Sequence, residues 1–308
     1  MLGKVIIYLI SIILIINLLN LRGINIKLNK YQLQAYENLG SIRNSKLSYN
    51  RLKNVLKNIN DFNYDVFIQG SYANKTNIPG DSDVDVIINL NDIFNHNINE
   101  HSKEDQEDFH RNHSNAKLSI KDFYDSVLSV LNDSNYNFLR KKKCLKISGT
   151  PLNVDLVVSN NYHNYTKYPN YIEGIKVYTS NNENIVSYPK LHKKNGFNKN
   201  SRVNSNYKRT VRIFKNIKSY LVSNSVISES IVSSYFIECL LYNVPDNYYQ
   251  NYNIEKRFFG ILNYLLNEPN FMEMKTQDEQ NYLFGDSDNQ WDKKHALKFL
   301  NWVNSFNR

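Results

Sequence analysis

The chain has 308 residues, of which 41% are hydrophobic and 22% are charged. These globular values exclude a fibrous or wholly disordered protein, and the length suits one or two domains. The net charge of +9 points to an anionic partner. The two cysteines, Cys144 and Cys239, lack neighbouring ligands at metal-binding spacing. This argues against structural zinc and for a reducing compartment, and we expect both thiols to be buried and inert.

An apolar segment at residues 5–21 precedes the rest of the chain. Its length is at the lower limit for a membrane-spanning helix of about 20 residues. More Lys and Arg residues follow it than precede it, which keeps the remainder in the cytoplasm. Residues 1–22 therefore predict a membrane anchor, with a cytoplasmic catalytic domain at the inner face of the cell membrane. The alternatives are a translation start near Ile24 and a cleaved signal, which no Ala-x-Ala site supports.

Secondary structure is expected soon after this segment. Residues 28–58 carry apolar side chains at helical spacing and predict one long or broken helix. Two short strands follow at residues 64–69 and 83–90, with a turn-rich loop between them. Residues 97–113 are polar and acidic, which is typical of a solvated loop or a helix end.

From residue 119 onward the sequence predicts both helices and strands. Residues 119–131 predict an amphipathic helix, and residues 138–147 and 152–159 predict a strand pair around a turn. From about residue 200 onward the pattern is helical. We therefore predict an α+β fold, with a mixed sheet flanked by helices in residues 23–200 and a helical C-terminal domain in residues 201–308.

The clearest chemical signal is a pair of acids, Asp83 and Asp85, at the start of the second strand. Residues two apart face the same side of a strand, so both carboxylates project together. A third acid, Asp155, lies in an apolar run, where a lone buried charge is costly without a partner. If the two strands pair, the three carboxylates can hold two Mg²⁺ or Mn²⁺ ions about 3.5 to 4 Å apart. Such a site suits in-line displacement at a phosphate, with Asp155 helping to activate the attacking hydroxyl.

A calcium-binding loop is the alternative for residues 81–92. That loop requires glycine at its sixth position, where this chain has Val86. The missing glycine disfavours calcium binding.

Phosphate contacts are predicted at Gly70 and Ser71, which follow the first strand. Glycine lets the backbone approach a phosphate, and a serine that opens a helix offers its hydroxyl beside free N–H groups. A Gly-Ser pair is a common turn, so its value comes from its place shortly before the paired acids.

Cations and an aromatic side chain are predicted farther along. Lys208, Arg212 and Lys215 fall at i, i+4 and i+7 on one face of a helix, apart from its apolar stripe. They would neutralise a triphosphate, and an ordinary solvated helix face is the alternative. Ser234 and Tyr235 open a later helix, where the hydroxyl can contact phosphate and the ring can stack on a base. Core packing is an equal alternative for Tyr235, which falls on an apolar stripe.

Together these motifs resemble the nucleotidyltransferases that include 2'-5'-oligoadenylate synthetases, cyclic GMP-AMP synthase and the bacterial CD-NTases of CBASS antiphage systems. The bacterial branch is the most similar. The match runs through residues 70–76, 82–86, 154–157, 195–196, 199–200, 207–215 and 234–241. The resemblance implies a DNA polymerase β-like core followed by a helical domain. The apolar N-terminus departs from the family pattern.

The resemblance also implies residue roles. It makes the three acids metal ligands and assigns Ser71, Lys215 and Ser234 to the donor triphosphate. It assigns Tyr235 to stacking on the donor base. The implied product is a cyclic di- or trinucleotide, made from nucleoside triphosphates, that activates a cell-killing effector during phage infection.

Other functions remain open from the sequence. One is a template-independent polymerase with a linear product, such as an oligoadenylate synthetase or a tRNA-terminus adder. Another is an inactive RNA-binding sensor that uses the basic residues 140–146 and 190–218, which the presence of all three acids disfavours. A basic surface on an active enzyme could also receive an activating RNA. A minimal antitoxin-type nucleotidyltransferase is disfavoured by the length of the chain.

Overall fold

The structure is a computed structural model that describes residues 28–80, 83–181, 183–267, 270–287 and 290–306. Residues 5–21, on which the predicted membrane anchor depends, lie outside these ranges, as do residues 81 and 82 of the alternative calcium loop. Across the described ranges, no helix combines the length and the apolar character needed to cross a bilayer.

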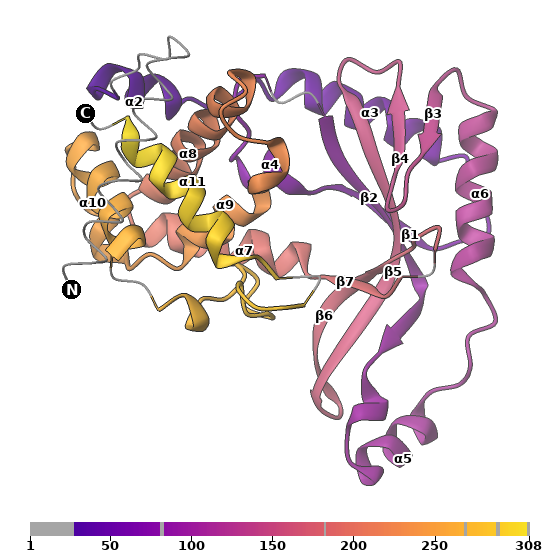
Figure 1. Cartoon of the computed structure of the whole chain (residues 1–308). Coiled ribbons are helices and arrows are strands. Elements are labelled where there is room, and N and C mark those ends of the chain that lie inside the picture. The colour runs from indigo at the N-terminus through magenta and orange to yellow at the C-terminus, as the bar shows by residue number, and fades with distance from the viewer. Residues whose placement is uncertain (1–27, 81–82, 182, 268–269, 288–289, 307–308) are drawn as a thin grey trace. The chain divides into compact units, whose positions relative to one another are not determined.

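The chain divides into two compact units. Within the described ranges, the sheet unit comprises residues 40–75 and 80–193, and the helical unit comprises residues 28–39, 76–79 and 194–306. The predicted α+β class, a mixed sheet with helices and a helical C-terminal region, is confirmed (Figure 1).

The sheet unit is built on a seven-stranded sheet of order β1-β2-β5-β4-β3, in which β6 pairs with β5 and β7. Its strands are β1 Tyr64–Ile68, β2 Asp83–His96, β3 Asn137–Arg140, β4 Leu145–Ser148, β5 Asn153–Lys167, β6 Asn170–Val177 and β7 Ile185–Ser187. β2 and β5 run parallel, whereas every other pair is antiparallel. The strands that carry the acids are therefore immediate neighbours.

Helices cover one face of this sheet. The helical segments of the unit are α3 Arg43–Leu56, α4 Gly70–Asn74, η1 Ile98–Glu100, α5 Lys103–Asn112 and α6 Ile120–Asn132. Val84 and Val86 of β2 are fully buried against Leu52 of α3 and Phe123 of α6. Because side chains alternate along a strand, this packing turns the aspartates of β2 to the opposite face.

Two predictions about local structure were wrong. Residues 138–147 span two strands rather than one, because the chain reverses at residues 141–144, where Lys141 N donates to Cys144 O at 2.8 Å and β3 pairs antiparallel with β4. The acidic residues 97–113 contain the helix α5, which lies at the far end of β2 (Figure 1). The Ser102 side chain caps this helix by accepting a hydrogen bond from Asp105 N, and the acids of its first turn favour the helix dipole.

The helical unit packs around its longest described helix. Its segments are α2 Lys30–Tyr36, α7 Pro189–Arg202 (which begins in the sheet unit), α8 Asn206–Ser223, η2 Glu229–Ile231, α9 Ser234–Tyr242, η3 Asp246–Tyr249, α10 Ile254–Asn267, η4 Phe271–Glu273 and α11 Lys293–Ser305. The longest of these, α8, contacts α2, α9 and α11. The predicted apolar stripe of α8 is confirmed, since Phe214 is fully buried with Phe236, Phe258 and Phe299 of the next three α-helices. The expected helix at residues 28–58 is broken into α2 and α3.

Candidate active site

Two of the predicted acids face each other across the parallel strands. Asp85 of β2 pairs in register with Asp155 of β5, and Asp83 pairs with Asn153. Neighbouring strands lie about 4.8 Å apart, and residues in register share a face. The strand pairing on which the predicted acid cluster depended is therefore present.

A lysine completes the row of charged side chains. Lys146 of β4 pairs in antiparallel register with Asp155. Its Nζ donates a hydrogen bond to Asp83 Oδ2 at 2.7 Å, while Asn153 Nδ2 donates to Asp83 Oδ1 at 3.3 Å. The sequence analysis missed Lys146, although its alternation with buried Leu145 and Ile147 would have placed it on the polar face.

Burial and charge act together on Asp155. Burial, followed by the negative charge of Asp83, raises the pKa of the Asp155 carboxyl. Its Oδ1 atom is buried without a hydrogen-bond partner. Burial raises the pKa of the adjacent Cys144 to about 11, so this thiol stays neutral. Cys144 is only half-buried, which corrects our expectation, whereas Cys239 is buried as expected.

These residues fit a divalent cation. Carboxylate oxygens are the ligands that hard cations prefer, and the orphaned Asp155 Oδ1 atom is one that a cation would satisfy. As the side chains stand, no group of three or more His, Cys, Asp or Glu within the described ranges has the arrangement of a preformed metal site. The ammonium of Lys146 instead contacts one of the carboxylates.

The glycine of the Gly-Ser pair packs directly against the acids. Gly70 has φ +65°, and a Cβ atom built on it would lie 2.2 Å from Asp85 Oδ2. The preceding residue, Gln69, donates its N–H to Asp85 O at 2.9 Å. Ser71 is the next residue of α4, a helix that contacts β2. The structure thus brings the predicted phosphate-binding pair beside Asp85.

The structure corrects the cationic stripe predicted on α8. Lys215 is only 2% exposed, and its Nζ lies 2.7 Å from Glu238 Oε1 of α9 and 3.3 Å from Thr76 O. Arg212 is half-buried, and its Nε donates to the carbonyl of Glu37. Helical spacing gave the relative directions of these side chains but could not show what packs against them. The sequence analysis gave no role to Glu238.

Ser234 and Tyr235 stand exposed at the start of α9. The preceding Ser233 caps the helix by accepting a hydrogen bond from Phe236 N at 3.0 Å. The Tyr235 hydroxyl donates to Asp278 Oδ2 at 3.2 Å, and the residue as a whole is 39% exposed. Tyr235 is therefore anchored at its hydroxyl end and packs near the Trp291 ring, at 5.7 Å between centroids, while the residue stays partly exposed.

Comparison with known proteins identifies the family. Residues 194–307 match the cGAS/DncV-like nucleotidyltransferase C-terminal helical domain, and residues 50–213 match the nucleotidyltransferase domain. The cyclic nucleotide synthase CdnE01 of Staphylococcus haemolyticus is 37% identical over 89% of this chain and 93% of its own length. The chain belongs to the cGAS/DncV-like nucleotidyltransferases, or CD-NTases.

Further relatives support an enzymatic activity. The cyclic UMP-AMP synthase of Rhodothermus marinus is 36% identical over 78% of this CD-NTase and 83% of its own length. A solved structure of Rhodothermus marinus CdnE with Apcpp and Upnpp has a TM-score of 0.82 and 33% identity, covering 90% of this chain and 95% of that one. This CD-NTase is therefore a nucleotidyltransferase that acts on nucleoside triphosphates, in a family that uses divalent metal ions.

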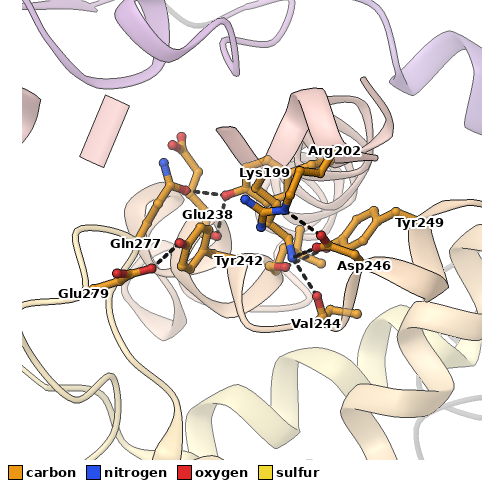
Figure 2. A network of polar contacts seen from close by, with 11 residues as sticks. Lys199, Arg202, Glu238, Tyr242, Val244, Asp246, Tyr249, Gln277 and Glu279 are labelled. Carbon is orange, nitrogen blue, oxygen red and sulfur yellow. Dashed lines mark hydrogen bonds and ion pairs between the residues drawn. The ribbon is translucent and has the colours of Figure 1, made fainter. Parts of the chain in front are cut away.

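Some cations of the basic run at residues 190–218 pair with acids within this CD-NTase. Lys199 is nearly buried, and its Nζ lies 2.9 Å from Asp246 Oδ1 and 2.8 Å from Val244 O, as Figure 2 shows. Arg202 pairs with the other oxygen of Asp246. Lys190 also has an acidic partner. These cations serve the fold, whereas Lys193, Lys194 and Arg209 of the same run are exposed.

Proposed function

We propose that this CD-NTase condenses nucleoside triphosphates into a cyclic di- or trinucleotide, with Asp83, Asp85 and Asp155 as ligands for two Mg²⁺ or Mn²⁺ ions. The observation that carries this proposal is the parallel register of Asp85 with Asp155, with Asp83 on the same face. Three carboxylates on two adjacent strands provide a compact, hard donor set.

The chemistry follows from the local environment of these acids. Bound divalent ions would activate the attacking hydroxyl and neutralise the departing pyrophosphate. The chain itself supplies a proton acceptor, because burial and Asp83 raise the pKa of Asp155. Its unpaired Oδ1 atom accepts the proton of the attacking ribose hydroxyl.

The sheet unit also contributes the first contacts to the substrate. Gly70 brings the backbone of α4 against Asp85, and the adjacent Ser71 offers its hydroxyl and N–H to the donor triphosphate. A side chain at position 70 would displace the Asp85 carboxylate, so glycine keeps phosphate and acids close together.

The helical unit contributes the remaining contacts. Ser234 binds the triphosphate and the ring of the partly exposed Tyr235 stacks on the donor base, with its hydroxyl held by Asp278. Lys215, whose ammonium is held by Glu238, contributes a charge-assisted contact to the donor triphosphate. Lys208 and Arg212 add positive charge along α8.

Product analysis tests the proposal. Purified protein is incubated with Mg²⁺ or Mn²⁺ and pairs of labelled nucleoside triphosphates, and the products are treated with phosphatase. We expect a product that resists phosphatase because a ring has no terminal phosphate, and we expect none from the Asp83→Ala/Asp85→Ala variant. ATP with UTP is the first pair to try, given the similarity to a cyclic UMP-AMP synthase. Phosphatase-sensitive products would instead indicate a linear polymerase.

Three further partners belong to the proposal. An activating RNA would contact exposed cations such as the lysines at 141–143, and turnover that added RNA leaves unchanged at low salt would exclude it. A downstream effector would respond to the cyclic product.

Residues 5–21 would hold the catalytic region at the inner face of the membrane. Fractionation of cells that express the chain with and without residues 1–22 would test this.

A further inference from the structure

Lys146 extends the acid row onto a third strand. It lies opposite Asp155 on β4, just as Asp85 lies opposite Asp155 on β2. One positive and two negative side chains therefore cross three adjacent strands on a single face of the sheet. The Lys146 ammonium reaches Asp83 and forms an ion pair of 2.7 Å with its Oδ2 atom.

This ion pair occupies an atom that the metal site needs. The Lys146 side chain is 37% exposed and that of Asp83 is 31% exposed, so the pair is only partly screened by solvent. An ammonium and a divalent ion repel each other and compete for the same oxygen lone pairs. An ammonium held at Asp83 Oδ2 therefore opposes a divalent ion at the same oxygen.

We infer that the Lys146 ammonium occupies the acid cluster in the metal-free enzyme. It must leave Asp83 before a divalent ion binds there. This lysine therefore sets the metal affinity of the nucleotide-free enzyme. It is a positioning residue that holds the Asp83 carboxylate in place and weakens the binding of a bare metal ion. A polyanionic nucleotide offsets the repulsion, so the site favours metal that arrives with a triphosphate. The inference rests on the proposed role of the three aspartates.

Mn²⁺ titration of the nucleotide-free protein tests this inference, with free Mn²⁺ followed by electron paramagnetic resonance. We expect Lys146→Met to bind Mn²⁺ about tenfold more tightly, the effect of removing a unit charge about 6 Å from a divalent ion in a water-like dielectric. Lys146→Arg retains the charge and the weak affinity. The matched control is Lys142→Met. Lys142 lies on the same β3–β4 hairpin as Lys146 but pairs with Glu183, so its removal should change the Mn²⁺ affinity by less than about twofold.

The direction of the change separates positioning from structural damage. Damage to the site would weaken binding, so only tighter Mn²⁺ binding by Lys146→Met supports the inference, and unchanged or weaker binding overturns it. The proposed function fails separately if wild-type protein shows no Mn²⁺ binding that the Asp83→Ala/Asp85→Ala variant loses.

A measurement on wild-type protein avoids dependence on how the variants fold. Lysine acetylation is followed by mass spectrometry with and without Mn²⁺. Acetylation of Lys146 should rise when Mn²⁺ displaces its ammonium from Asp83, while acetylation of Lys142 stays constant. Unchanged or reduced labelling of Lys146 on Mn²⁺ addition contradicts the inference.

Discussion

Gly70→Ala tests whether the close approach of the Gly70 backbone to the Asp85 carboxylate is needed for activity. Gly70 adopts φ +65°, which costs an alanine about 1–2 kcal/mol. The added Cβ atom would also lie 2.2 Å from Asp85 Oδ2, far inside van der Waals contact. The short, half-buried side chain of Asp85 must then move, or α4 must shift away from β2.

The size of the effect follows from this overlap. Restoring an ordinary contact of about 3.4 Å moves the carboxylate by roughly 1 Å, and a misplacement of that size costs on the order of 100-fold in rate. We therefore expect Gly70→Ala to lose about 100-fold in kcat/KM and to weaken Mn²⁺ binding. The free energy of unfolding should fall by about 1–2 kcal/mol from backbone strain.

Gly80→Ala is a matched control. Gly80 also has a positive φ, +95°, but a Cβ atom there would have no neighbour within 4 Å. It should lose stability by a similar amount and keep most of its turnover. The assays are cyclic-product formation, Mn²⁺ titration and urea unfolding. Equal turnover of the two variants would show that contact between Gly70 and Asp85 has no part in catalysis.

Three further predictions concern the charged residues. Asp155→Asn should lower turnover at least about 100-fold, yet melt no lower than wild type at pH 8 without metal. The raised pKa of Asp155 means that its stabilising effect is present at low pH and lost as pH rises through the folded-state pKa, which differential scanning fluorimetry across pH will measure. Lys215→Met should cost about 3–5 kcal/mol in urea unfolding because it leaves Glu238 buried and unpaired, and adding Glu238→Leu should restore most of this; no recovery would argue against the buried pair. Arg212→Met should cost about 1–2 kcal/mol in the same assay by removing a donor to the Glu37 carbonyl, and an unchanged midpoint would contradict that role.

Several features of the site could be predicted from local sequence. The alternation of aspartate with valine on β2 required that Asp83 and Asp85 share a face, and the buried valines agree with it. The apolar run around Asp155 marked a buried strand, and the apolar stripes of α6 and α8 marked their core faces. These are consequences of the two-residue repeat of a strand and the 3.6-residue repeat of a helix.

The partners of the charged side chains could not be predicted in this way. Lys215 shares its helix with Lys208 and Arg212, yet Glu238, which lies on α9, and Thr76, which lies far away in the sequence, surround its ammonium. Lys146 likewise reaches Asp83 across 63 positions of the chain. Repeats along the chain give the direction of a side chain relative to its neighbours. Its burial and its ion pairs depend on which distant segments pack against that direction, and only the tertiary fold decides this.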